Sequence, residues 1–331
     1  MSIAVVILNW NGLELLKTYL PSVVGYSQDA QVYVLDNAST DDSLAYINKE
    51  FPQVKCIKNK QNRGYAGGYN EGLQQVKEDI FILLNNDVEV TENWLIPIIK
   101  CFETQKEVAV IQPKILDYKS REYFEYAGAA GGFLDFCGYP FCRGRIFMTL
   151  EKDEGQYDED TEIQWASGAC LAIRKVAFKN VNGFDETYFA HQEEIDLCWR
   201  IHNKGQKIWY CHDSSVYHLG GGTLNTLNPR KTFLNFRNSL FNILKNVCFP
   251  IYIFVLIKRL ILDGVACVRF LFLGQFKHIL AVLHAHFSFY FYFFKVFKSR
   301  EKQPQKKEYY KTWSIVFQYF ILGKKYFKDL S

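Results

Sequence analysis

A carboxylate lies just after an apolar run in the first third of the chain. Residues 80–84 are Ile-Phe-Ile-Leu-Leu, which is typical of a buried parallel strand, and Asn85, Asn86 and Asp87 come next. Open α/β sheets bind ligands beyond the carboxyl ends of their strands. At that place Asp87 is the kind of oxygen ligand that holds Mg²⁺ or Mn²⁺ against substrate phosphates. The alternative is a plain turn, because Asn and Asp often turn chains.

Two earlier strands should end at the same edge. Residues 3–8 are apolar and lead into Asn9, and an amphipathic helix is predicted over residues 13–24. A second strand, residues 32–35, ends in Asp36 and Asn37. Asp36 therefore also lies at the carboxyl end of a strand.

A glycine-rich loop comes next and opens a helix. Its sequence over residues 62–70 is NRGYAGGYN, with Arg63, Gly64, Gly67 and Asn70 as candidate nucleotide contacts. Backbone N–H groups and an arginine suit a nucleotide or its phosphates. It is not the dinucleotide fingerprint, because no G-x-G-x-x-G follows the first strand. The alternative is that these glycines only allow close packing of a helix on a sheet.

Eight short segments occur in an ordered series over the first three quarters of the chain. They are VILNWNG (6–12), VLDNASTD (34–41), NRGYAGG (62–68), LNND (84–87), GACLAIR (168–174), GFDE (183–186), EEIDLC (193–198) and VYH (216–218). In order and spacing they resemble the family 2 glycosyltransferases with the GT-A fold, and closely the bacterial rhamnosyltransferase-like branch. The resemblance implies an α/β fold with a mixed, mainly parallel sheet. It also implies nucleotide contacts from Asn9, Asp36, Asn37, Arg63, Gly64, Gly67, Asn70 and Asn86.

The resemblance also implies a metal site. The family's Asp-x-Asp motif is Asn85-Asn86-Asp87 here, which leaves Asp87 as the principal ligand and Asn85 as a secondary candidate. His218 matches a late histidine of the family that reaches the same metal. Neutral imidazole ligates Mn²⁺, whereas Mg²⁺ prefers oxygen. The alternative for His218 is a histidine beside the glycine turn at residues 220–222.

The resemblance places the catalytic base in the acidic cluster Glu193, Glu194 and Asp196. The second acidic residue, Glu194, would face the hydroxyl of the acceptor. Like charges raise one another's pKa, which suits a base near neutral pH. Apolar residues follow the cluster, so we expect a partly buried helix with its acids at an exposed N-terminal end. The alternative is a solvated acidic helix start, which the helix dipole favours.

Residues 123–145 are rich in glycine and aromatic residues, and an acidic stretch follows at 151–162. We assign residues 123–145 to the acceptor side. Trp165 and Gly168 then lead into a strand near the sugar. Trp165 could stack on a sugar ring, although a tryptophan of the core is the simpler interpretation.

The last quarter differs in charge from the rest of the chain. Residues 240–331 hold 15 Lys and Arg against 4 Asp and Glu, a net charge of +11; because the whole chain carries +4, residues 1–239 carry −7. Residues 249–273 and 279–297 are apolar and aromatic, but charged residues interrupt them, so neither is a clean transmembrane helix. Basic aromatic helices on an anionic membrane surface fit better, strengthened by the basic stretch at 298–311. The alternatives are a helical subdomain packed on the sheet, or a dimer interface.

Composition is consistent with a cytoplasmic enzyme at the inner face of the membrane. Nine scattered cysteines without a C-x-x-C pair indicate neither a zinc site nor a disulfide framework. The first apolar run is too short for the core of a signal peptide. No nucleic-acid partner is expected.

The predicted organisation is a catalytic domain over residues 1–239 and a membrane-docking region over 240–331. The predicted function is inverting, metal-dependent transfer of rhamnose or a hexose from a nucleotide-diphosphate donor to a lipid-linked or polysaccharide acceptor. A nucleotidyltransferase and a catalytically inactive binding protein at the membrane stay open as alternatives.

Overall fold

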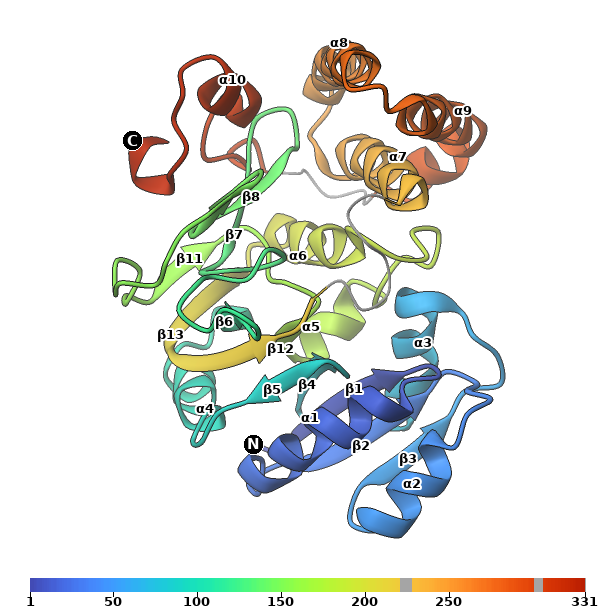
Figure 1. Ribbon diagram of the computed structural model, residues 1–331, viewed down its shortest axis with the longest axis vertical. Coiled ribbons are helices and arrows are strands. Elements are labelled where there is room, and N and C mark those ends of the chain that lie inside the picture. The colour runs from blue at the N-terminus through green and yellow to red at the C-terminus, as the bar shows by residue number, and fades with distance from the viewer. Residues whose placement is uncertain (221–227, 301–305, 331) are drawn as a thin grey trace.

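A nine-stranded mixed sheet forms the centre of the computed structural model, which describes residues 1–220, 228–300 and 306–330. Its strands are β1 (Ile3–Asn9), β2 (Gln31–Asp36), β3 (Lys55–Lys58), β4 (Ile80–Asn85), β5 (Val88–Val90), β6 (Val108–Asp117), β11 (Thr161–Ile163), β12 (Cys170–Arg174) and β13 (Lys207–His218). Neighbours follow the order β11-β13-β6-β12-β4-β1-β2-β3, and β5 pairs with β13 (Figure 1). β1 to β4 are mutually parallel, whereas β12 is antiparallel to β4 and β6. The predicted strands and the mainly parallel sheet are confirmed.

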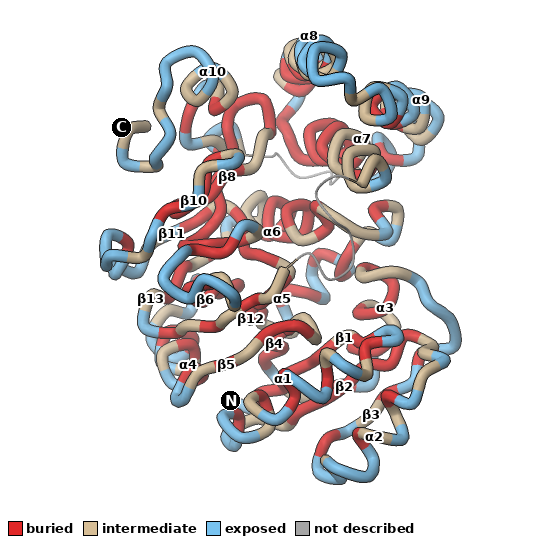
Figure 2. The backbone as a smooth tube through the Cα atoms, viewed as in Figure 1, coloured by how far each residue is buried: buried red, intermediate tan, exposed pale blue. Residues whose placement is uncertain are grey.

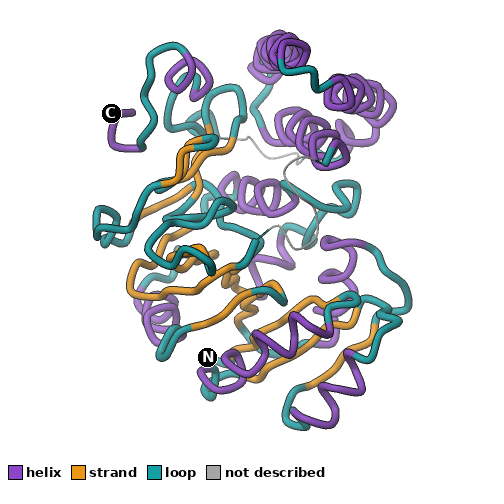
Figure 3. Tube along the Cα trace, in the orientation of Figure 1, coloured by secondary structure: helices purple, strands orange, loops and turns teal. Residues whose placement is uncertain are grey.

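Helices cover both faces of this sheet (Figure 3). The first helices are α1 (Leu13–Tyr26), α2 (Ser43–Glu50), α3 (Gly64–Gly72), α4 (Leu95–Thr104), α5 (Lys175–Asn180) and α6 (Glu193–Asn203), with a 3₁₀ turn at Leu73–Gln75. Along β1, Val5 and Ile7 join the core under α1 and α4, whereas Ala4 and Val6 join the core under α3 and α6. Because both faces are buried, the central strands are continuously apolar (Figure 2).

A second, four-stranded sheet forms from the glycine-rich and aromatic segment. It consists of β7 (Gly132–Leu134), β8 (Pro140–Cys142), β9 (Arg145–Ile146) and β10 (Thr149–Leu150), joined in antiparallel order. The C-terminal segment, residues 306–330, packs against this sheet. Tyr309 donates a 2.6 Å hydrogen bond to the carbonyl of Phe136, and Asp135 accepts one from the backbone N–H of Ile315. The C-terminal segment contains α10 (Ile315–Phe320) and a 3₁₀ turn at Phe327–Leu330.

Three long helices, α7 (Pro229–Asn246), α8 (Ile251–Phe272) and α9 (Phe276–Lys298), lie together beyond α6 (Figure 1). Arg259 and Asp263, two of the charges that interrupt the apolar stretches, turn inward, whereas Arg269, His284 and Lys295 are exposed. Asp263 is fully buried and pairs with Arg259 at 2.8 Å and His286 at 3.1 Å, while Tyr139 donates it a hydrogen bond. Burial raises the pKa of Asp263, but the positive charge of Arg259 outweighs burial, so the pKa of that carboxyl lies below its usual value.

The opposite faces of these helices remain apolar. Of 34 large hydrophobic side chains that are exposed among the described residues, 24 lie between residues 249 and 326. Phe287, Phe291 and Phe294 on α9 are 71%, 81% and 75% exposed. Within the described part of the chain, α9 alone is long and apolar enough to cross a membrane, by length and composition. The region from α7 to the C-terminal segment, called the tail below, is thus packed on the rest of the chain and apolar on its outer surface.

Candidate active site

Asp87 and His218 meet where two strands pair. β4 ends at Asn85, the chain turns through Asp87, and β5 pairs antiparallel with β13 so that Val88 lies opposite His218. This register brings Asp87 Oδ1 to 3.1 Å from His218 Nε2. The pairing of adjacent strands, which local sequence does not encode, therefore builds the contact that the family resemblance implied.

Glu125 completes this group, and sequence reasoning missed it. Its Oε1 lies 3.3 Å from His218 Nδ1, and its other oxygen accepts a hydrogen bond from the backbone N–H of Ala127. All three side chains, Asp87, Glu125 and His218, are buried. Burial lowers the pKa of His218, but the two carboxylates outweigh burial and raise it to about 10.

The oxygen and nitrogen donors of Asp87 and His218 fit Mn²⁺, because carboxylate and neutral imidazole are both acceptable ligands. Binding would have to displace the proton that the two carboxylates hold on His218. Glu125 would orient the ring from its other nitrogen, as carboxylates commonly do behind a metal-bound histidine. No group of three or more acidic, histidine or cysteine side chains is arranged as a ready metal site within the described residues. For Asn85, the described contact is its backbone N–H, which donates to the carbonyl of Ala169.

The predicted nucleotide edge is assembled at the carboxyl ends of β1 and β2. Asn86 Nδ2 donates to Asn9 Oδ1 at 3.0 Å, which ties the turn before Asp87 to the end of β1. Asp36 is fully buried; its Oδ2 accepts from the backbone N–H of Ser39, and its Oδ1 lacks a partner among the described residues. A buried carboxylate oxygen without a partner is costly unless a ligand satisfies it.

The glycine-rich loop lies beside this edge. Asn37 Nδ2 donates to the carbonyl of Gly64, whose φ of +70° is left-handed and whose added Cβ would meet the backbone of Phe189 at 2.6 Å. That close approach explains the glycine. At Gly67 an added Cβ would meet the Arg63 side chain at 2.5 Å.

Two predicted nucleotide contacts are engaged within the protein. Arg63 pairs with Glu186 at 2.5 Å. Asn70 exchanges two hydrogen bonds with the backbone of Phe184 and therefore fastens α3 to the GFDE segment. A nucleotide that used Arg63 would have to compete with Glu186, to which the sequence analysis gave no role although it belongs to the GFDE segment.

The acidic pair Glu193 and Glu194 opens α6, and its burial corrects an expectation. We expected acids at an exposed helix end, but Glu193 is only 4% exposed, with Oε2 unpartnered among the described residues, and Glu194 is half-buried. Burial raises the pKa of Glu194 to about 7, and burial together with the charge of Glu194 raises that of Glu193 well above its usual value. Glu194 is therefore a candidate base matched to neutral pH.

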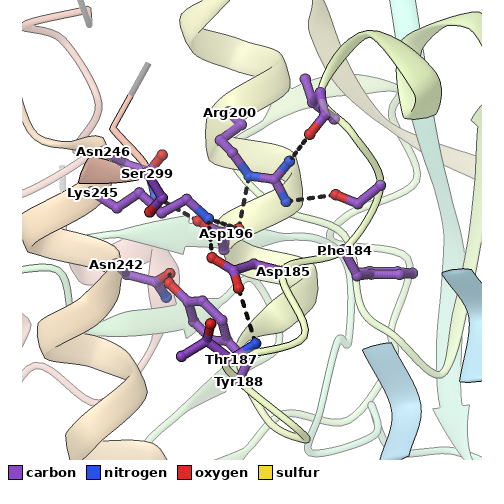
Figure 4. Close-up of polar contacts among 12 residues, drawn as sticks. Phe184, Asp185, Thr187, Tyr188, Asp196, Arg200, Asn242, Lys245, Asn246 and Ser299 are labelled. Carbon is purple, nitrogen blue, oxygen red and sulfur yellow. Dashed lines mark hydrogen bonds and ion pairs between the residues drawn. The ribbon is translucent and has the colours of Figure 1, made fainter. Parts of the chain in front are cut away.

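The third acid of the cluster, Asp196, belongs to a buried ion cluster (Figure 4). Its Oδ2 accepts from Arg200 at 2.8 Å and Lys245 at 2.9 Å, and its Oδ1 accepts from Asn246 at 3.0 Å. Burial raises the pKa of Asp196, but the positive charges of Arg200 and Lys245 outweigh burial and lower the pKa below its usual value. Both oxygens of Asp196 are thus engaged in holding α6 against α7.

The chain before α6 is strained and held by α7. Phe189, His191 and Gln192 all have φ between 65° and 68°, which is unfavourable for residues other than glycine. Asn238 on α7 donates hydrogen bonds to the carbonyls of Tyr188, Ala190 and His191. The helix that contains the predicted domain boundary thereby fixes the position of the acidic pair.

Trp165 is a core residue, as the simpler interpretation held. It is 3% exposed, its Nε1 donates to the carbonyl of Phe133, and its ring fills the space beside Gly132. Gly168 lies beside the glycine-rich loop, because its carbonyl accepts a 2.8 Å hydrogen bond from the hydroxyl of Tyr65. Gly221 and Gly222 of the predicted turn lie outside the described residues.

Comparisons with known proteins agree with this architecture. The family model described as Glycosyl transferase family 2 matches residues 4–181, more than half of the chain. The chain is 26% identical over 219 residues to the N-acetylglucosaminyl-diphospho-decaprenol L-rhamnosyltransferase of Mycobacterium tuberculosis (strain H37Rv), covering 61% of this chain and 71% of that protein. It is 29% identical over 150 residues to the rhamnosyltransferase WbbL of Escherichia coli (strain K12), covering 45% and 56%.

Two solved structures share the fold. GalNAc-T7 in complex with UDP, GalNAc and Mn²⁺ aligns with a TM-score of 0.54 at 21% identity, over 66% of this chain and 43% of that one. The mannosyltransferase PcManGT of Pyrobaculum calidifontis, in complex with GDP-Man and Mn²⁺, aligns with a TM-score of 0.53 at 11% identity, over 86% and 73%. With the matched family model, these likenesses establish that the chain belongs to the family 2 glycosyltransferases and is a glycosyltransferase with the GT-A fold.

Proposed function

We propose that this protein transfers a sugar, rhamnose or a hexose, from a nucleotide-diphosphate donor to a hydroxyl of a lipid-linked or polysaccharide acceptor, with inversion and with Mn²⁺ or Mg²⁺. The observation that carries the proposal is that the candidate groups adjoin one edge of the sheet. The Asp87–His218 pair adjoins Asn86 and Asn9 at the nucleotide edge. The segment before Glu194, whose pKa burial raises to about 7, reaches the glycine-rich loop, where the backbone N–H of Tyr65 donates to the carbonyl of Phe189.

The residues at this edge suggest a role for each group in nucleotide binding, metal binding and proton transfer. Asp36, with its unpartnered Oδ1, would accept a hydrogen bond from the nucleoside. Asp87 and His218 would hold the divalent ion, which supplies charge stabilisation for the departing diphosphate. Glu194 would accept the proton of the acceptor hydroxyl as that oxygen attacks the sugar carbon from the face opposite the leaving group. One displacement inverts the configuration.

The choice of donor and acceptor follows the relatives. Two of them are named as rhamnosyltransferases, and one of these names a polyprenyl diphosphate sugar as its acceptor. A third, Agl10 of Haloferax volcanii, is named as a hexosyltransferase of glycan biosynthesis. A lipid-borne acceptor at the inner face of a cell membrane also fits the apolar outer faces of α8 and α9.

The function is tested by a donor screen that detects release of nucleoside diphosphate. We expect the full chain to turn over dTDP-rhamnose or a UDP-hexose with Mn²⁺ or Mg²⁺, and EDTA to abolish turnover. Asp87→Ala should lower kcat by about 10²–10³, because an electrostatic stabiliser of the leaving group is removed. Unchanged turnover in EDTA would exclude the metal role, and no turnover of any donor would contradict the proposal.

We further propose that α8 and α9 rest on an anionic membrane surface. Their outward apolar side chains would enter the interface, and exposed Lys277, Lys295 and Lys298 would meet anionic headgroups. Residues 301–305 of the predicted basic stretch lie outside the described part.

The membrane proposal predicts sedimentation of the full chain with phosphatidylglycerol-containing vesicles, and less with neutral ones. High salt should release only part of it, because salt screens charge and leaves apolar burial intact. Replacing Phe287, Phe291 and Phe294 by serine should abolish sedimentation. Serine at Met148 and Val176, which are 74% and 68% exposed elsewhere, is the matched control. Equal sedimentation of both variants would contradict docking through α9.

A further inference from the structure

Two arginines of the small sheet differ in how their charges are balanced. Arg143 donates from Nε to the carbonyl of Ala130 and lies 3.6 Å from Glu159. Arg145, two residues on, is only 8% exposed, and no carboxylate lies within 4 Å of it among the described residues. Its one described hydrogen bond goes to the thiol of Cys142 at 3.6 Å, and its Nε has no partner there.

A buried cation without a partner is expensive, and proteins keep such groups where a ligand supplies the opposite charge. Packing alone does not require Arg145 here, because an apolar side chain would fill the same volume without the cost of desolvating a guanidinium. The five N–H donors of arginine match the oxygens of a phosphate group.

A second cation lies at the same place. The guanidinium of Arg145 is 4.5 Å and the ammonium of Lys231 is 5.9 Å from the centre of the Tyr126 ring. Lys231 belongs to the first turn of α7, at the positive end of the helix dipole. It forms no ion pair among the described residues. Tyr126 follows Glu125, so the two cations stand next to the His218 group.

We infer that Arg145 and Lys231 form a diphosphate subsite beside the Asp87–His218 pair. This inference rests on the proposed function, whose substrates supply two sources of diphosphate: the nucleotide donor and a polyprenyl diphosphate acceptor. Lys231 begins the helix that leads into the apolar α8–α9 pair, which favours the lipid-borne source.

The test measures binding of inorganic pyrophosphate to the full chain in EDTA by calorimetry. Arg145→Met and Lys231→Met should each weaken binding by about tenfold to a hundredfold, because charge-assisted hydrogen bonds are lost. Arg230→Met, which removes the exposed neighbouring cation, is the matched control and should bind as the wild type does. The melting temperature of Arg145→Met should equal or exceed that of the wild type, whereas a structural arginine would lower it.

UDP and farnesyl diphosphate then separate the two sources. A loss confined to farnesyl diphosphate assigns the subsite to the acceptor, and a loss for UDP assigns it to the donor. Unchanged affinity of Arg145→Met and Lys231→Met for all three probes would overturn the inference, whichever variant is the more stable. These are binding measurements, so they stand apart from the donor screen: a wild-type chain that turns over no donor contradicts the proposed function, not the subsite.

Discussion

Replacing Glu194 by glutamine is expected to lower kcat by about 10²–10⁴ while the affinity for nucleotide stays nearly unchanged. Glutamine keeps the shape of the side chain but cannot accept the proton of the acceptor hydroxyl. Steady-state kinetics with the donor found in the screen, together with calorimetric titration of UDP, measure the two quantities separately.

Glu193→Gln is the matched control for this substitution. Glu193 is more deeply buried, and burial together with the charge of Glu194 raises its pKa well above the usual value, which disfavours the ionised form that a base needs. We expect Glu193→Gln to retain most activity. The opposite ranking of the two variants would show that the first acid of the pair is the base.

The pH profile gives a second readout for Glu194. A base works only when deprotonated, and burial raises the pKa of Glu194 to about 7. Activity should therefore rise about tenfold per pH unit between pH 5 and pH 7 and level off above that. The same shift makes the stability of the fold depend on pH. The protonated carboxyl is favoured in the fold, so its stabilising contribution is fully present below the usual pKa of glutamate and is lost as pH rises through 7. A profile that is flat from pH 5 to pH 8 would contradict the role of Glu194.

A chain that ends at residue 239 is expected to fail to fold. The predicted boundary falls inside α7, and the cut removes Lys245 and Asn246, the partners of buried Asp196. Removing one partner of a buried ion pair costs about 3–5 kcal/mol, which is a large share of the 5–15 kcal/mol typical of whole domains. The cut also removes Leu240 and Phe241, which are fully buried in the shared core.

Circular dichroism and thermal unfolding of the 1–239 chain measure this effect, with the full chain in the same detergent buffer as the control. We expect no cooperative transition and no binding of UDP. Lys245→Met in the full chain isolates the ion cluster: it leaves Asp185 and Asp196 without their ammonium and should lower the melting temperature while α7 remains. A soluble 1–239 chain that unfolds cooperatively and binds UDP would show that the tail is a separate domain.

Local sequence determined the catalytic sheet. Apolar runs buried on both faces, turn residues after each run and a glycine-rich helix start are local signals, so the strands ending at Asn9, Asp36 and Asn85 were predicted to within one residue. The ordered series of motifs also indicated the family.

The tertiary structure decided which side chains work together. Glu125 carries no motif, and only the pairing of β13 with β5 and β6 brings it to His218. The tail was predicted as an appendage, because charge and hydropathy report what a segment contains and not which face turns inward. Arg259 and Asp263 pair inside the fold, and Lys245 reaches Asp196 across 49 residues of sequence. Contacts so distant in the chain depend on how helices pack, which no local pattern of residues specifies.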